Sequence, residues 1–169
     1  MSYASPFGRL DADHDSVAHT LCLSRTHCVS APEETLAEYH QAAVAAIERS
    51  APQPAFFLAR QLAELTLKAL HTSPYRFTHR LDQLLESLAE AGDDLLAGGS
   101  EENDLVAFIR DLDACDSAGD EGRYPTTRNG TPALANVCCA DPALLRALVD
   151  RLHTYAQTRL ALRQGAATP

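Results

Sequence analysis

Apolar residues recur at helical spacing in five successive segments of this chain, and that periodicity constrains the fold more than any other feature of the sequence. In residues 81–88, for example, the leucines fall on one helical face, because residues three and four apart lie together on a helix. Prolines and glycines separate the segments. The pattern predicts an all-α protein, an up-and-down bundle of about five helices with a long irregular loop before the last helix.

Capping residues and helix breakers mark where each expected helix begins and ends. Ser30 and Glu33 make a capping-box pattern at the start of the first helix, and Pro52 with Pro54 is expected to separate it from the second. The expected helices are residues 32–49, residues 55–71, a third capped by Thr78 and ended by Gly92 or Gly98-Gly99, a fourth from Ser100, and a last one opened by Asp141-Pro142.

The second expected helix has the strongest apolar periodicity of the chain. Glu64 and Lys68 stand four residues apart on it, in the orientation that favours an ion pair on an exposed face. The apolar positions at helical spacing are expected to face the core. They are Leu58, Leu62, Leu65 and Ala69, widened by Phe57 and Leu70.

Two stretches lack a helical period. Residues 116–142 contain three glycines and two internal prolines, and loops of this length are uncommon in compact domains and often functional. Residues 1–29 are also irregular, although residues 17–22 could form a short strand. A chain of 169 residues suits a single folded unit. We therefore expect one domain over residues 1–169 with an irregular N-terminal segment.

The net charge of −9 bears on which partners the protein can bind. General coating of nucleic acid is disfavoured, because gripping a phosphate backbone requires a basic face. No apolar run approaches the roughly 20 residues that cross a bilayer. The N-terminus, residues 1–10, lacks the basic start and apolar stretch of a secretory signal. We expect a cytoplasmic protein with no membrane partner.

Cysteine and histidine spacing gives little support for a metal site. The five cysteines are irregularly spaced, and we expect reduced, mostly buried thiols, including Cys138 and Cys139. Zinc ligands usually come in pairs separated by a few residues, a pattern that the N-terminal set only approximates. That set is His19, Cys22, His27 and Cys28. No nucleotide-binding glycine loop is present either, so we expect neither a metal nor another cofactor.

Two stretches of the chain resemble the HEPN superfamily of prokaryotic helical bundles. The first runs from Phe57 to Leu70, containing Glu-Leu-Thr-Leu-Lys-Ala-Leu, and is followed by the Thr-His-Arg-Leu of residues 78–81. The second is the Gly-Arg-Tyr-Pro of residues 122–125, followed by Asn129-Gly130 and Leu134. Together they cover roughly residues 57–155. The resemblance implies a helical bundle that often forms a homodimer and works in toxin–antitoxin, phage-defence or RNA-processing systems.

Active members of that superfamily are metal-independent ribonucleases that use an arginine and a histidine shortly after it. This chain departs from that pattern, because residues 129–147 contain no histidine and His153 lies well inside the last expected helix. Cleavage of RNA without a metal needs a proton acceptor and a proton donor, and arginine supplies neither. The leading expectation is a non-catalytic HEPN-like binding or interaction module. The alternatives are a ribonuclease that brings His79 or His153 to Arg123, and a structural protein partner.

The candidate site combines a helix start with the long loop. Helix N-termini bind anions, so Thr78, His79 and neighbouring arginines are a sensible place for RNA, a nucleotide or a partner protein. The candidate binding residues are Arg76, His79, Arg80, Arg123, Tyr124 and Arg128, with His79 and Arg123 as catalytic candidates. The structural alternative is that the arginines pair with nearby carboxylates, or that Arg123 anchors the loop through backbone carbonyls. Those carboxylates are Asp82, Glu86, Asp111 and Asp113.

Overall fold

The computed structural model describes residues 31–71, 78–92, 100–127 and 129–166. The chain divides into two units, residues 1–31 and residues 32–169, and the described helices belong to the second. Several sequence predictions lie outside the described residues. They are the strand at residues 17–22, the His19, Cys22, His27 and Cys28 set, and the side chains of Ser30, Arg76 and Arg128.

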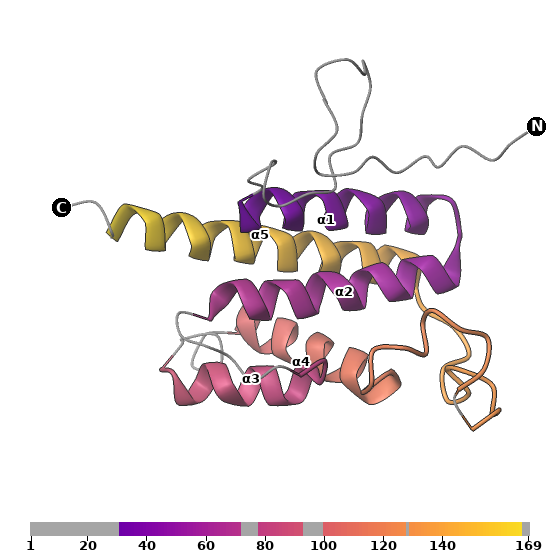
Figure 1. Ribbon diagram of the computed structural model, residues 1–169. Helices are drawn as coiled ribbons and strands as arrows, with labels where there is room; N and C mark the ends of the chain where they lie inside the picture. Colours follow the sequence, from indigo (N-terminus) through magenta and orange to yellow (C-terminus); the bar gives the residue numbers. More distant parts are fainter. Residues whose placement is uncertain (1–30, 72–77, 93–99, 128, 167–169) are drawn as a thin grey trace, which may run out of the picture. The chain divides into compact units, whose positions relative to one another are not determined.

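The described part of the chain folds into five α-helices, which confirms the predicted all-α bundle (Figure 1). Within these residues the only extended pairing is an isolated bridge between Thr126 and Pro132 in the long loop. None of the described helices combines the length and apolarity needed to cross a membrane. The helices are α1 (Pro32–Glu48), α2 (Pro52–Leu70), α3 (Leu81–Glu90), α4 (Ser100–Cys115) and α5 (Pro142–Ala166).

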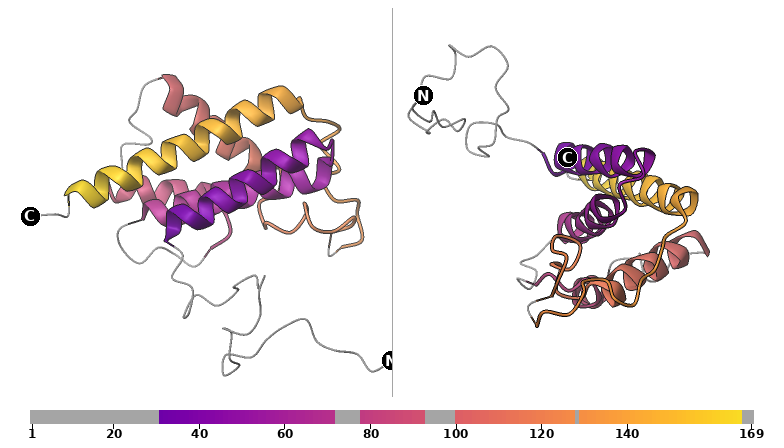
Figure 2. Two further views of the ribbon diagram at one scale, coloured as in Figure 1. Left: turned by 90° about the horizontal axis from the view of Figure 1, so that it is seen from above. Right: turned by 90° about the vertical axis from the view of Figure 1, so that its right-hand side faces the viewer.

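Helix α2 is the centre of the bundle, because it packs against each of the other four helices. On one side of it lie α1 and α5, which also pack on each other, and on the other side lie α3 and α4 (Figures 1 and 2). A helix surrounded in this way must bury more than one face. This position explains why the single apolar stripe predicted for α2 is only partly right.

The core confirms most predicted apolar positions, but α2 differs from expectation. Leu62 is fully buried, whereas Leu58 and Leu65 are only half-buried. Two charged side chains of the same helix, Arg60 and Glu64, are buried instead. The predicted leucines of α3 and the apolar residues of α4 all lie in the core. They are Leu81, Leu84, Leu85, Leu88, Leu105, Phe108, Ile109 and Leu112.

Two predicted helix starts are wrong for physical reasons. Helix α2 begins at Pro52 rather than Ala55, because the amides of a first helical turn have no intrahelical partner and prolines are accepted there. Helix α3 begins at Leu81, and Thr78 is not its cap. The carboxylate of Asp113 on α4 accepts the Leu81 N–H instead, at 2.7 Å. This cap comes from a residue 32 positions away, so local sequence does not reveal it.

The predicted start of the last helix is confirmed. Asp141 precedes Pro142 and accepts hydrogen bonds from the backbone N–H groups of Ala143 and Leu144 through Oδ1, at 2.8 and 3.1 Å. Aspartate is a favoured N-cap, and proline suits the first turn. The irregular loop before α5 therefore ends at a well-defined helix start.

Candidate functional site

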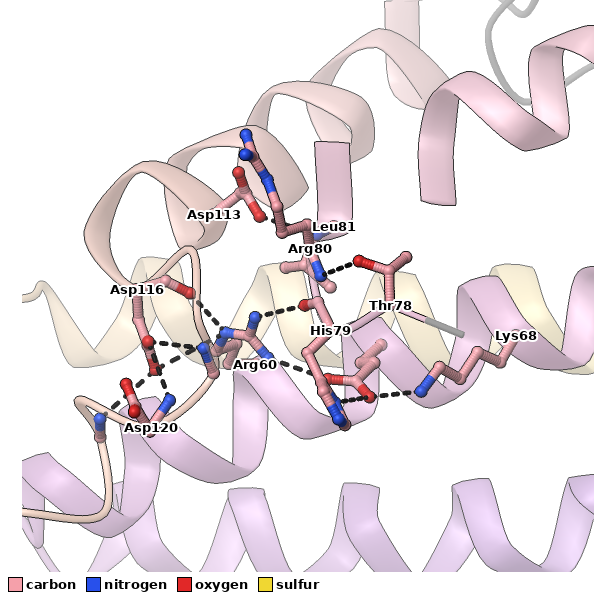
Figure 3. A network of polar contacts seen from close by, with 12 residues as sticks. Arg60, Lys68, Thr78, His79, Arg80, Leu81, Asp113, Asp116 and Asp120 are labelled. Carbon is pink, nitrogen blue, oxygen red and sulfur yellow. Dashed lines mark hydrogen bonds and ion pairs between the residues drawn. The ribbon is translucent and has the colours of Figure 1, made fainter. Parts of the chain in front are cut away.

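A buried arginine joins α2 to the start of α3 and to the first turn of the long loop. Arg60 of α2 has no solvent exposure, and its guanidinium donates to three different groups (Figure 3). Nη2 donates to the carbonyl of His79 at 2.6 Å, and Nη1 donates to the Glu64 carboxylate at 3.0 Å. Nε donates to the carbonyl of Asp116 at 2.8 Å and lies 3.6 Å from its carboxylate. Arg60 thus fixes α2, the start of α3 and the long loop against one another.

Glu64 lies one turn further along α2 and collects three donors on its carboxylate. Oε1 accepts hydrogen bonds from Lys68 Nζ at 2.6 Å and from His79 Nδ1 at 2.9 Å, while Oε2 accepts the bond from Arg60. Burial would raise the pKa of Glu64, but the hydrogen bonds from Lys68, His79 and Arg60 outweigh it and lower the pKa. The carboxylate is therefore ionised inside the bundle. The predicted Glu64–Lys68 pair is made, but not on an exposed face, since Glu64 is 4% exposed.

Asp116 organises the first turn of the long loop. Its Oδ1 accepts the N–H groups of Gly119 at 2.7 Å and Asp120 at 3.0 Å. Gly119 has φ of +75°, and a Cβ added there would lie 2.7 Å from Nη1 of Arg60. Only glycine meets both conditions, the left-handed backbone and the close approach. The loop is therefore built around the guanidinium of Arg60.

His79 is the one candidate residue whose imidazole joins this network. Its side chain is 72% exposed, and Nδ1 contacts the buried Glu64 carboxylate. An ionised carboxylate can only accept, so Nδ1 carries the hydrogen. In the neutral imidazole, Nε2 is then the basic nitrogen. This arrangement of a carboxylate and an imidazole is also one that enzymes use to orient a general base.

The other described candidates have local partners. Arg80 pairs with Asp82 at 2.6 Å, which confirms the predicted pairing of an arginine with that carboxylate. Arg123 donates through Nη2 to the carbonyl of Gly119 at 2.9 Å, which confirms that it anchors the loop. Its guanidinium carbon lies 5.8 Å from the ring centres of both Phe57 and Tyr124. Tyr124 is 57% exposed.

His79 and Arg123 contact α2 at separate places. His79 is bonded to Glu64, and Arg123 lies beside Phe57, seven residues earlier on the same helix. Seven residues correspond to about 10 Å along a helix axis. Arg80 and Arg123 engage different partners, a carboxylate and a backbone carbonyl. Arg76 and Arg128 lie outside the described residues.

His153, the other histidine considered for catalysis, belongs to a cluster on α1 and α5. Its ring stacks on that of His40, with ring centres 4.2 Å apart, and its Nε2 contacts Gln157 at 3.2 Å. Burial and the charge of His40 lower the pKa of His153, and Asp150 offsets part of this effect. Asp150 itself binds His40 at 2.7 Å. His153 therefore contacts His40 and Gln157 in this cluster, whereas Arg123 bonds the long loop.

An apolar pocket of about 490 Å³ lies where the α1–α2 turn, α4, the end of the long loop and the start of α5 meet. Phe56, Phe108 and Leu145 are among its lining residues, together with Cys115 and Cys139. None of the candidate residues predicted from the sequence lines it. The sequence shows no signal for this pocket, because it forms between segments far apart in the chain.

The described cysteines differ from the prediction of buried thiols. Cys138 and Cys139 are exposed on the long loop with their sulfur atoms 2.9 Å apart, and Cys115 is half-buried. Burial raises the pKa of Cys115, and the charges of Asp111, Asp116 and Glu121 raise it further. The thiol of Cys115 is therefore neutral at physiological pH. Cys138 and Cys139 lie in a loop that packs only partly on the helices, which explains their exposure.

Among the described residues, no three or more His, Cys, Asp or Glu side chains are arranged to hold a metal ion. Sequence reasoning missed Arg60 and Asp116, the two residues that hold the site together. A charge at position 60 within an otherwise apolar stretch of α2 was the available signal. Comparisons of the chain with protein-family models, with curated proteins and with solved structures found no match.

Proposed function

We propose that this protein is a non-catalytic binding module of HEPN-like organisation. The observation that carries the proposal is the separation of His79 and Arg123 on α2. A metal-independent ribonuclease needs a proton-transferring histidine and a charge-stabilising arginine at one phosphate. Here the two residues contact α2 about two helical turns apart, roughly 10 Å. Each is also bonded to the protein itself.

The balance of charged residues around the Arg60 network disfavours binding of a polyanion such as RNA. The cationic residues around the network are Arg60, Lys68, Arg80 and Arg123. The carboxylates there are Glu64, Asp82, Asp113, Asp116, Asp120 and Glu121. Among the described residues, which do not include Arg76 and Arg128, more acidic than basic groups surround the site, so a phosphate backbone would meet net repulsion from them. A partner protein or a small molecule is the better fit.

The residues that carry the resemblance meet in space, which supports the HEPN-like part of the proposal. Within the first stretch, Glu64 contacts both Lys68 and His79. The second stretch packs on the first at Phe57, because Gly122 approaches it closely and the Arg123 guanidinium lies 5.8 Å from the centre of its ring. The homodimer and the link to a bacterial defence or toxin system that the resemblance implies belong to the proposal as well. Light scattering on the purified protein at several concentrations measures the dimer directly.

One observation favours the ribonuclease alternative. The Glu64 carboxylate orients the His79 imidazole through Nδ1, leaving an exposed side chain whose other nitrogen is basic. A carboxylate bonded to one ring nitrogen is one way in which a protein orients a histidine as a general base. The second cation at this carboxylate is Lys68, which donates to the same Oε1 atom and cannot accept a proton, so His79 is the general-base candidate among the described residues of the network. Any cleavage by this protein must therefore depend on His79.

An RNA-cleavage assay in the presence of a metal chelator separates these two functions. Wild-type protein is compared with His79→Ala and Arg123→Ala on single-stranded and structured RNA. The proposal predicts no cleavage above that of a mock purification by any of the three proteins. Circular dichroism establishes that each variant is folded, and Arg151→Ala on α5 serves as a charge-matched control. Cleavage by wild type and Arg151→Ala that disappears in His79→Ala overturns the proposal in favour of a variant ribonuclease.

A further inference from the structure

We propose that the apolar pocket between the α1–α2 turn, α4 and α5 is a binding site for an aromatic or otherwise apolar organic cation. This inference goes beyond the proposed function, because it places a ligand away from the network around Arg60 and names the chemical class of that ligand. It is carried by three features of the pocket: its volume, the sign of its charges and its aromatic lining. Each is independent of the network around Arg60.

The volume suits a small molecule. Sites for small molecules typically measure about 300–1,000 Å³ and have mainly apolar walls with few polar groups. The pocket measures about 490 Å³. Its walls are leucine, isoleucine, valine, alanine, proline and phenylalanine side chains, with Ser50 among the few polar residues. An apolar ligand bound there would displace water from these apolar walls, which is the favourable term in such binding.

All the formal charge in the lining is negative. The pocket is lined by two carboxylates, Asp111 and Asp141, and by no lysine, arginine or histidine. Asp141 already caps α5, whereas Asp111 is exposed on α4 and makes no ion pair within the described residues. The Cys115 thiol stays neutral because its pKa is raised. A bound anion would face uncompensated repulsion, and a cation would gain an opposite charge.

The aromatic lining favours a cation over a neutral ligand. Phe56 of α2 and Phe108 of α4 both line the pocket. The face of a phenylalanine ring attracts a cation by about 0.5–2 kcal/mol, more as water is removed. Quaternary ammonium and phosphonium groups suit such a site because their charge is spread over a bulky, weakly hydrated group. The net charge of −9 adds a long-range attraction for cations.

Two ions of matched size and opposite charge test the proposal. Tetraphenylphosphonium and tetraphenylborate have the same tetrahedral arrangement of phenyl rings, so a difference in binding reports the charge alone. Isothermal titration calorimetry on the full-length protein is expected to show tetraphenylphosphonium binding at least about tenfold more tightly. Raising the ionic strength is expected to reduce this preference.

Three variants locate the binding. Asp111→Asn is expected to weaken tetraphenylphosphonium binding about threefold and to strengthen tetraphenylborate binding, since the pocket loses one of its charges. Phe56→Leu keeps an apolar side chain but removes a ring, and is also expected to weaken the cation about threefold. Glu86→Gln on α3 removes the same charge outside the pocket lining and serves as the control.

The outcomes separate this inference from the proposed function. Equal affinity for the two ions, no binding of the cation, or equal effects of Asp111→Asn and Glu86→Gln would each overturn the inference. The proposed function is judged by RNA cleavage, a different readout that depends on His79 and not on the pocket. A negative titration with no RNA cleavage rejects the cation site alone, whereas cleavage that requires His79 rejects the binding module whatever the titration shows.

Discussion

Two regions of α2 differ in whether the rest of the protein supplies contacts for their side chains. In the middle of the helix, Arg60 and Glu64 are buried charges whose donors and acceptors are met by other groups of the protein. At its start, Pro52, Ala55 and Phe56 border an apolar pocket that the protein leaves open. The charged side chains find their hydrogen-bond partners within the protein, whereas the apolar side chains at the start of the helix border a pocket. The difference indicates that the network holds the fold and that the pocket is free to receive a ligand.

The energetics of buried charge support this division. Burying an ion pair costs several kcal/mol per ion in desolvation, which attraction offsets only when the geometry is good and every donor is used. In the Arg60 network each of the three guanidinium nitrogens has an acceptor, and two of these acceptors are backbone carbonyls. Removing one member leaves the others buried without a partner. Such a network specifies one arrangement of α2, α3 and the long loop, and offers few free groups for a ligand.

The largest expected effect comes from breaking the network at its centre. Arg60→Met keeps an apolar stem but leaves the Asp116 carboxylate without its ion-pair partner and Glu64 with one donor fewer. We expect the free energy of unfolding to fall by about 3–5 kcal/mol in urea denaturation. Arg123→Met, in the same region but on the surface, is expected to cost less than about 1 kcal/mol. Equal losses for the two variants would remove the distinction between a structural and a surface arginine.

The turn that packs on Arg60 gives the next largest effect. Gly119→Ala places a Cβ 2.7 Å from the guanidinium and forces alanine to φ of +75°. Gly130 has a similar φ of +78° but no atom within 4 Å of the added Cβ, so it isolates the cost of the backbone alone. We expect a loss of about 3 kcal/mol at position 119 and about 1 kcal/mol at position 130. Losses of the same size would mean that the contact with Arg60 does not constrain the turn.

Acid titration of the network gives an intermediate effect. The pKa of Glu64 is lower in the folded protein than its ordinary value of 4.5, because three hydrogen bonds outweigh burial. The stability that this carboxylate contributes is therefore present above its unfolded pKa and lost as the pH falls through the folded pKa. At neutral pH, Glu64→Gln is expected to lose roughly 2 kcal/mol.

Unfolding measured from pH 7 downwards tests the sign of this contribution. The difference in stability between wild type and Glu64→Gln should shrink as the pH falls through the lowered pKa. A difference that stays constant or grows in acid would show that the charge of Glu64 does not stabilise the network. Glu86→Gln, on the surface of α3, controls for the removal of one carboxylate.

The smallest expected effect is at Thr66, a buried polar residue of α2 that, unlike Arg60 and Glu64, has no hydrogen-bond partner within the described structure. Thr66 is fully buried on α2, and its hydroxyl has no hydrogen-bond partner within the described structure. Replacing it with valine keeps the shape and removes an unsatisfied polar group, so thermal unfolding should show a gain of about 1 kcal/mol. Thr158→Val, an exposed threonine that bonds the carbonyl of Thr154, should be close to neutral. A loss at position 66 would indicate that its hydroxyl is satisfied in solution.

Local patterns were sufficient to predict much of the fold. The start of α1 at Pro32, the start of α4 at Ser100 and the cap of α5 by Asp141 depend on residues within one helical turn. The apolar faces of α3 and α4 follow from spacing alone, and every apolar position predicted for them lies in the core. For α2 periodicity was only partly right: its apolar stripe lies in or against the core, but the helix contacts all four other helices and buries charged positions as well.

The candidate site was predicted less well, because its contacts join residues far apart in the sequence. Arg60 bonds His79 and Asp116, at separations of 19 and 56 residues, and Asp113 caps a helix 32 residues before it. Spacing rules relate residues within a few positions of one another, so they do not predict contacts at these separations. Sequence motifs did identify His79 and Arg123, but not the separate contacts that keep them apart. The pocket was missed because four segments supply its walls.

A nuclear magnetic resonance titration tests the central claim most directly, since it reports on both regions of α2 at once. Tetraphenylphosphonium is added to protein labelled with ¹⁵N, and the shift of each backbone amide is followed. We expect the amide shifts that change to cluster in residues 50–56, 108–115 and 137–148, and those of residues 60–68 and 116–123 to stay nearly constant. Changes concentrated around Arg60 and Glu64, or none in the pocket at saturating cation, would contradict the division between a saturated network and an open binding site.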